Sequence, residues 1–316
     1  MDNLPPSVTQ SLILFLLMAA GFGAGKAGVL RGETIKVLSK FLVEFTLPAL
    51  IIMSMQRPFS MELRDQALRI LGFSAVFYAL TIPLSYLLCA GYRKASPAEK
   101  GVHRFAMSFS NVGFMGFPVA ESLLGRDSLF IVSIYNIPFQ ILAFSLGVVM
   151  VGGAVAKKAG SRRQQLVQSL MLLRNPAILG AVAGFALFML SVRIPEPVAT
   201  AMNLFGGMTT PLAMTVIGAV LAQTRIGPVL GNPRLWLTTA YRLLANPLMV
   251  AGAAAALGLS GLDMQVPVLI AAMPIAANTS ILAGAYGGDE VMASSLVFIS
   301  TVLSLLTIPL MGLLIL

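Results

Sequence analysis

The sequence SNVG at Ser110–Gly113, followed by Gly116 and Pro118, interrupts an apolar stretch that would otherwise form one long helix. A second interruption, NTS at Asn278–Ser280, follows Pro274 in another apolar stretch. Backbone groups freed inside a membrane are costly unless they line a cavity. Paired interruptions in the two halves of a chain indicate the binding site of a membrane carrier.

The composition predicts an integral membrane protein. Of the 316 residues, 57% are hydrophobic and only 10% are charged, whereas soluble domains carry about 25% charged residues. Runs of about 20 apolar residues cross a bilayer as helices. The sequence contains ten such runs, so we expect an all-α fold with short connections. They are 8–29, 34–55, 67–91, 101–124, 128–152, 175–193, 197–223, 234–258, 263–286 and 290–314.

The net charge of +9 is explained by membrane topology, because cytoplasmic loops are rich in Lys and Arg. Fifteen of the 21 basic residues fall in one alternating set of loops, and five fall in the opposite set. The basic set comprises residues 26–40, 93–104, 157–174 and 225–234. This pattern predicts a multi-pass protein of the plasma or inner membrane with both termini outside the cytoplasm, and it argues against nucleic acid as a partner.

Residues that bind metals or perform catalysis are scarce. Cys89 is the single cysteine, which excludes an intramolecular disulfide and a cysteine metal cluster. His103 is the single histidine, and we expect it in a cytoplasmic loop as a solvated or capping residue. No glycine motif that could cradle a phosphate is present. The sequence therefore predicts no metal site, no cofactor and no enzymatic activity.

The two halves of the chain resemble each other at a nearly constant offset. The matching pairs are Pro48 with Pro211, Pro83 with Pro247, and Asn111 with Asn278. Each half contains five expected spans, so the second half would enter the membrane from the opposite side. We therefore predict a first repeat at 1–152, a cytoplasmic linker at 153–174 and an inverted second repeat at 175–316, an arrangement that permits alternating access.

The interruptions favour an anionic ligand. The N-terminal end of a half-helix carries unpaired N–H groups and partial positive charge. Asn111 and Asn278 could hydrogen-bond a carboxylate or cap their own half-helices, and both roles remain open. Ser110, Thr279 and Ser280 are further candidate ligands. Gly113, Pro118 and Pro274 are the residues expected to break the helices.

Ionisable residues inside the spans are candidates for coupling. Glu44 could be neutralised by Lys40 one turn earlier, or it could carry a coupling proton. Asp65 and Arg69 are spaced to form an i, i+4 pair. Arg242 could reach the cytoplasmic interface or counter the charge of a substrate.

Several motifs resemble the auxin efflux carrier family. These are FSNVGFMGFP at 109–118, YGGD at 286–289 and SLLTIPL at 304–310. The resemblance covers essentially the whole chain. It implies a fold similar to that of bile acid sodium symporters, with ten spans in two inverted five-helix repeats and crossed, broken helices four and nine. It also implies secondary transport of organic anions by an elevator mechanism, a scaffold of the first, second, sixth and seventh spans, and a homodimer.

The resemblance assigns roles to particular residues. Asn111 matches the crossover asparagine of the fourth span, and Asn136 matches a polar residue of the fifth span. Asp65 and Arg69 resemble an Asp-x-x-x-Lys pair of the plant carriers. Ser110 and Thr279 stand where the plant carriers have prolines, so specificity for indole-acetate is not implied.

We therefore expect a secondary active transporter of a small carboxylate, either a dicarboxylate or an auxin-like acid. Proton coupling at Asp65 or Glu44 is a weaker hypothesis. A sodium-coupled organic anion symporter is the main alternative, although the breaks lack acidic residues that would favour a cation. A channel, an intramembrane enzyme and a receptor are further alternatives. An intramembrane enzyme would need a membrane-embedded His or paired Asp residues, which the sequence lacks.

Overall fold

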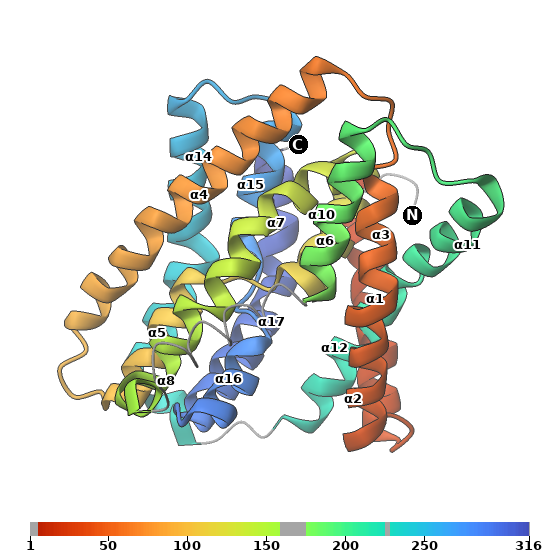
Figure 1. The fold of residues 1–316 in the computed structure, drawn as a ribbon. Helices are drawn as coiled ribbons and strands as arrows, with labels where there is room; N and C mark the ends of the chain where they lie inside the picture. The colour runs from red at the N-terminus through yellow and green to blue at the C-terminus, as the bar shows by residue number, and fades with distance from the viewer. Residues whose placement is uncertain (1–5, 159–174, 225–227, 316) are drawn as a thin grey trace.

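The computed structural model describes residues 6–158, 175–224 and 228–315, and in these ranges the chain is helical, with one isolated β-bridge (Figure 1). The first half contains α1 (Pro6–Lys26), α2 (Gly32–Phe41), α3 (Leu47–Ser54), α4 (Met61–Ala90), α5 (Pro97–Ser108), α6 (Phe117–Leu124), α7 (Ser128–Phe144) and α8 (Leu146–Lys158). The second half contains α10 (Pro176–Met189), α11 (Glu196–Gly207), α12 (Thr209–Gln223), α13 (Pro233–Ala240), α14 (Asn246–Ala256), α15 (Leu262–Ala272), α16 (Asn278–Tyr286) and α17 (Glu290–Ile315). A short 3₁₀ turn, η3 (Pro228–Gly231), precedes α13. The predicted all-α class is confirmed.

Six helical stretches of the described residues are long and apolar enough to cross a membrane. They are 8–26, 32–54, 61–90, 128–152, 196–223 and 290–314. The other four predicted spans contain helices that are shorter or interrupted, such as α5 with α6 and α15 with α16. Together these features describe a multi-pass membrane protein. Of the predicted linker 153–174, α8 includes the first six residues, and 159–174 lie outside the described residues.

Within the described ranges, three π-helical turns interrupt the α-helices, and each ends two residues before a proline. They are η1 (Leu42–Thr46) before Pro48, η2 (Val112–Gly116) before Pro118 and η4 (Tyr241–Ala245) before Pro247. A proline ring clashes with the carbonyl four residues earlier, and a wider turn relieves that clash. Pro83, by contrast, lies inside the continuous helix α4. Prolines matched by sequence position, Pro83 and Pro247, therefore have different local structures.

Helix α1 packs directly against α12 through small residues. A Cβ atom at Gly21 would overlap the backbone carbonyl of Thr215, and one at Gly218 would overlap the backbone carbonyl of Met18. Because glycine has no side chain, the two backbones can approach this closely, as membrane helices often do. Gly21 and Gly25 of the sequence GFGAG at 21–25 therefore serve helix packing, and they join the N-terminal helix to the second half of the chain.

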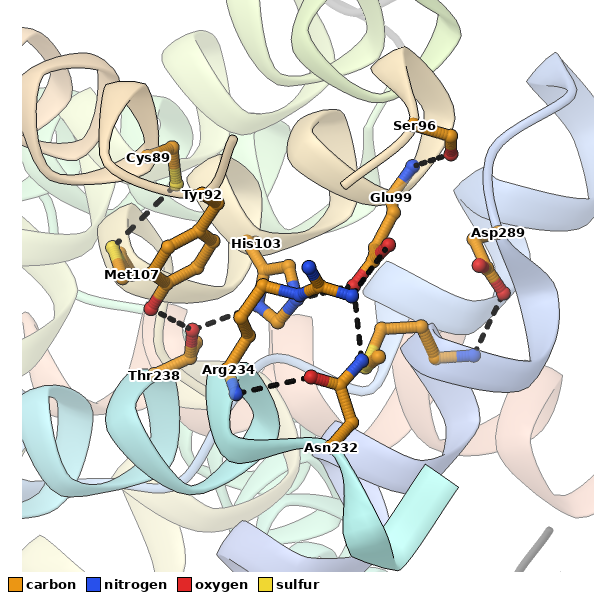
Figure 2. A network of polar contacts seen from close by, with 11 residues as sticks. Cys89, Tyr92, Ser96, Glu99, His103, Met107, Asn232, Arg234, Thr238 and Asp289 are labelled. Atoms are coloured by element: carbon orange, nitrogen blue, oxygen red, sulfur yellow. Dashed lines mark hydrogen bonds and ion pairs between the residues drawn. The ribbon is translucent and has the colours of Figure 1, made fainter. Parts of the chain in front are cut away.

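His103 lies in α5 and is completely buried, so the expectation of a solvated loop residue is wrong. Figure 2 shows its surroundings, where α5 meets α13. His103 Nδ1 lies 2.7 Å from Thr238 Oγ1, and Nε2 lies 3.5 Å from Glu99 Oε1. Glu99 also pairs with Arg234 Nε at 2.9 Å and accepts from Asn232 Nδ2 at 3.1 Å. Tertiary packing brings these groups together, which sequence position alone does not show.

Tyr92, in the turn between α4 and α5, extends this network. Its hydroxyl lies 3.1 Å from Thr238 Oγ1. Burial raises the pKa of the Tyr92 phenol, so the hydroxyl stays neutral and keeps its proton at neutral pH. The network therefore links the turn after α4 with α5 and α13 by neutral and charged hydrogen bonds.

Replacing Glu99 by glutamine should destabilise the protein by about 1–3 kcal/mol, because it leaves the half-buried Arg234 guanidinium without its carboxylate partner. The melting temperature of the purified protein should fall measurably. The matched control is Glu33→Gln, which removes the exposed Glu33–Lys36 pair of α2 and should change stability little. Equal melting temperatures for the two variants would contradict a structural role for the network.

Candidate functional site

Two helix breaks lie close together in the middle of the bundle. Break 1 (Phe109–Asn111) separates α5 from η2 and α6, and break 2 (Met273–Ala277) separates α15 from α16. In Figure 1, α5 and α16 occupy the lower half of the molecule, whereas α6 and α15 occupy the upper half. The two interrupted segments therefore pass through the centre in opposite directions.

Proline explains break 2. Pro274 has no N–H group, and the residue before a proline avoids the helical conformation. Met273 accordingly has φ −63° and ψ 147°, and α15 ends at Ala272. Break 1 contains no proline, and Phe109 nevertheless adopts an extended conformation, with φ −118° and ψ 124°.

Backbone hydrogen bonds join the two breaks. The Asn111 N–H donates to the Pro274 carbonyl at 2.8 Å, and the Ala276 N–H donates to the Phe109 carbonyl at 3.2 Å. These bonds form the isolated antiparallel bridge between Ser110 and Ile275. The Ile275 N–H donates to Ser300 Oγ of α17 at 3.1 Å. Each break thus satisfies backbone groups that the other leaves free, which buried peptide groups require.

A small cavity opens beside the paired breaks. Its volume is about 100 Å³, enough for several water molecules. Its walls come from both breaks and the turns that follow them in η2 and α16, from α7, from η1, and from the starts of α3 and α10. The lining residues are Val43, Leu47, Ser110, Asn111, Val112, Gly113, Phe114, Phe139, Gln140, Phe144, Asn175, Ala177, Ala276, Ala277 and Asn278. None of these side chains is ionisable, and the polar ones are amides and one hydroxyl.

Hydrogen bonds fix which end of each amide can meet a ligand. Asn111 Oδ1 accepts from the Phe114 N–H at 3.3 Å, which leaves its NH₂ group as the remaining donor. On the opposite wall, Asn175 Oδ1 accepts from the Ala177 N–H at 2.9 Å, so Asn175 Nδ2 donates to Gln140 Oε1 at 3.2 Å. The Gln140 NH₂ group then remains as a donor. Backbone donors thus orient two side-chain amides so that N–H groups are left for a ligand.

Asn278 adds a third amide to the cavity. It is the first residue of α16, and its half-exposed side chain has no hydrogen-bond partner among the described residues. The first turns of η2 and α16 also present N–H groups and the positive end of the helix dipole. Amide donors and helix N-termini, with no carboxylate nearby, suit an anion better than a cation.

The C-terminal ends of α5 and α15 have the opposite character, because they present carbonyl groups. Arg242, in η4, is only 1% exposed. Its guanidinium donates to the carbonyls of Met107 at 3.2 Å, Ala271 at 3.0 Å and Met273 at 3.2 Å. These carbonyls end α5 and α15. The hypothesis that the Arg242 side chain reaches the cytoplasmic interface is therefore wrong.

The comparison with protein families identifies the chain. The model of the family described as "Membrane transport protein" matches residues 6–312. The chain belongs to this family. The resemblance to auxin efflux carriers is thereby confirmed, and the protein is a membrane transporter rather than an enzyme.

Relatives of this transporter are similar over most of their length. It is 27% identical to an "Uncharacterized transporter" of Methanothermobacter thermautotrophicus, with 96% of this chain and 97% of the relative covered. It is 28% identical to a "Putative malonate transporter" of Rhizobium meliloti, with 88% and 86% covered. It is 22% identical to the "Uncharacterized transporter YfdV" of Escherichia coli, with 87% of each covered.

The cavity of the transporter includes several of the predicted binding and break residues: Ser110, Asn111, Gly113 and Asn278. Thr279 is buried, and its hydroxyl donates to the Ala276 carbonyl at 2.6 Å. Ser280 and Asn136 are not among the lining residues. Pro118 lies in the first turn of α6, and Pro274 lies in break 2.

The predicted ionisable residues lie away from the cavity lining. The prediction that Asp65 and Arg69 pair with each other is wrong. Asp65 pairs with the neighbouring Arg64 at 2.7 Å, and Arg69 pairs with Asp263 of α15 at 3.2 Å. The packing of α15 against α4 brings the Asp263 carboxylate within reach of Arg69, whereas the i, i+4 spacing does not bring Asp65 to it. Glu44 is exposed, and its carboxylate lies 4.0 Å from Lys40 Nζ, consistent with the hypothesis of mutual neutralisation.

Sequence reasoning did not assign Gln140 and Asn175 to the site. Gln140 is a strongly polar residue inside a largely apolar span, which is a usable signal. Asn175 precedes Pro176 and caps α10 with its side chain. An Asn-Pro pair predicts a helix start, but only the fold shows that this start faces break 1.

Proposed function

We propose that the protein is a secondary active transporter of a small organic anion, a carboxylate, that works by alternating access. The observation that carries this proposal is the cavity beside the paired breaks. Its free polar groups include the NH₂ donors of Asn111 and Gln140, its lining includes no acidic residue, and two helix N-termini begin beside it. A carboxylate accepts hydrogen bonds only, so it matches this set of groups.

The proposed architecture is that of ten spans in two inverted five-helix repeats, 1–152 and 175–316, with α5–α6 and α15–α16 as crossed, broken helices. This is the bile acid sodium symporter-like fold. The opposite directions of the two interrupted segments and their shared β-bridge support it.

An elevator movement is consistent with the position of the cavity. The second and sixth spans, which belong to the proposed scaffold, line it through Val43, Leu47, Asn175 and Ala177. The remaining walls come from the breaks and α7, which belong to the proposed mobile domain. Close packing of α1 against α12 would hold the scaffold together. Movement of the mobile domain would carry Asn111 and Asn278 past the fixed wall.

The substrate we favour is a short dicarboxylate such as malonate. The cavity of about 100 Å³ is small beside the roughly 300–1,000 Å³ of pockets for larger ligands. The relative from Rhizobium meliloti is described as a putative malonate transporter. Auxin-like aromatic acids would need a wider cavity.

The remaining features follow from topology and family. Helices α1, α4 and α12 each end at the lower end of the bundle in Figure 1, and in the sequence each is followed by a segment of the basic set. We propose that this end is cytoplasmic, that both termini lie outside, and that the protein is a homodimer in the plasma or inner membrane. Asp65, Arg69 and Glu44 are surface residues, so proton coupling through them is the weaker part of the proposal.

The test is ligand-induced stabilisation of the purified protein. Malonate should raise the melting temperature, because a ligand that binds only the folded state stabilises it by mass action. Indole-acetate should raise it less. Asn111→Ala and Asn278→Ala should both remove the malonate shift, and neither should unfold the protein. A malonate shift that survives in both variants would refute the site, and no shift with any carboxylate would refute the substrate class.

A further inference from the structure

Arg242 is a buried cation at the point where two helices end. It lies in η4, and its three hydrogen bonds reach the last turn of α5, through Met107, and the end of α15, through Ala271 and Met273. Asn246 Nδ2 lies 3.4 Å from the Ala271 carbonyl and supports the same end. The carbonyl ends of two helices thus converge on one guanidinium.

Among the described residues, no carboxylate forms an ion pair with this charge. The titratable groups that interact with it are the phenols of Tyr78, Tyr135 and Tyr241. A buried charge is costly unless polar groups compensate it. Here the compensation comes from carbonyl oxygens and from the negative ends of two helix dipoles.

The same kind of oxygen cage binds metal cations in other carriers. Unwound backbone carbonyls and the C-terminal ends of half-helices coordinate sodium at the centre of many secondary transporters. In this chain the guanidinium already occupies such a cage. A sodium ion at the same place would meet both a filled volume and a like charge.

We propose that Arg242 is the permanent occupant of a monovalent-cation site formed by the ends of α5 and α15. Under the proposed transport function, this fixed cation replaces a co-transported sodium ion. The positive charge holds the C-terminal ends, while the amide-lined cavity receives the anion at the N-terminal ends. Transport of the anion then requires no sodium, and loss of Arg242 exposes a site that accepts a small cation.

The first experiment measures stability without substrate. The wild-type protein should melt at the same temperature in sodium chloride and in choline chloride of equal ionic strength. Arg242→Ala should melt at a clearly lower temperature in choline chloride. Millimolar guanidinium should restore part of the loss, and sodium should restore some of it. The control is Arg193→Ala, which removes an exposed arginine and should respond to neither cation.

Three results would each overturn the proposal: stabilisation of the wild type by sodium, an Arg242→Ala variant that melts like the wild type, or an Arg242→Ala variant that responds to neither cation. If Arg242→Ala does not fold, Arg242→Gln takes its place, since it keeps a side-chain donor for one carbonyl. It should become more stable in sodium than in choline, and equal melting in the two salts would refute the proposal. Arg242→Lys retains a cation and should stay indifferent to sodium.

The two proposals fail independently. The cation experiments use melting temperature in the absence of any carboxylate, so they do not depend on the substrate. A missing malonate shift with the expected cation response would refute the carboxylate proposal alone. A malonate shift with a sodium-stabilised wild type would refute the role of Arg242 alone.

Discussion

Replacing Asn111 by aspartate should reduce carboxylate transport by on the order of 100-fold or more, while the protein remains folded. Aspartate is as good a helix N-cap as asparagine, so its oxygen can still accept from the Phe114 N–H. The change removes the NH₂ donor and places a negative charge in the cavity. Two like charges about 4 Å apart repel by about 4 kcal/mol at an effective dielectric constant of about 20. Uptake of labelled malonate into proteoliposomes measures the effect.

Two further variants separate charge from capping. Asn111→Ser keeps a capping oxygen without adding charge, so it should lose less transport than Asn111→Asp. Ser60→Asp exchanges the N-cap of α4, which lies outside the cavity lining, and should leave uptake unchanged. If Asn111→Asp transported malonate as well as the wild type, the anion site would not lie at break 1.

Replacing Gly218 by leucine should prevent stable folding, with a loss of at least about 3 kcal/mol. Any Cβ at this position overlaps the Met18 backbone carbonyl, and Phe22 N lies 2.7 Å away. Backbone atoms cannot rotate aside as a flexible side chain can, so α1 and α12 would have to separate. The yield of monodisperse protein in size-exclusion chromatography and its melting temperature measure the loss.

The matched control is Gly23→Ala on α1. A Cβ at Gly23 has no neighbour within 4 Å. This variant should therefore fold normally, and the better helix propensity of alanine should stabilise it by up to about 1 kcal/mol. Comparable damage from both substitutions would mean that α1 does not rest on α12 as the structure indicates.

Much of the fold is determined by local sequence. The apolar runs predict where helices lie, because a helix is the only single-segment structure that satisfies its backbone in lipid. Pro274 determines the end of α15, since it forces Met273 out of the helical conformation. The glycines of α1 predict close packing, and the amides at Asn111 and Asn278 predict a polar site at the breaks.

Other features depend on contacts between distant parts of the chain. His103 and Arg69 acquire partners from α13 and α15, at sequence separations that periodicity does not describe. Gln140 joins the site because Asn175, held by the start of α10, orients its amide. Asn136, one turn earlier on the same helix, does not line the cavity.

Break 1 shows most clearly which features depend on local sequence and which depend on tertiary contacts. The sequence at Phe109–Asn111 permits an interruption but contains no proline to enforce one. Its extended backbone is held by hydrogen bonds to the Pro274 carbonyl and the Ala276 N–H of break 2. The Arg242 guanidinium donates to the Met107 carbonyl at the end of α5. The sequence by itself determined a membrane-embedded helical carrier with two interrupted helices. Only the tertiary structure decided that the two interruptions lie together and bond to each other, because each supplies the hydrogen-bonding groups that the other lacks.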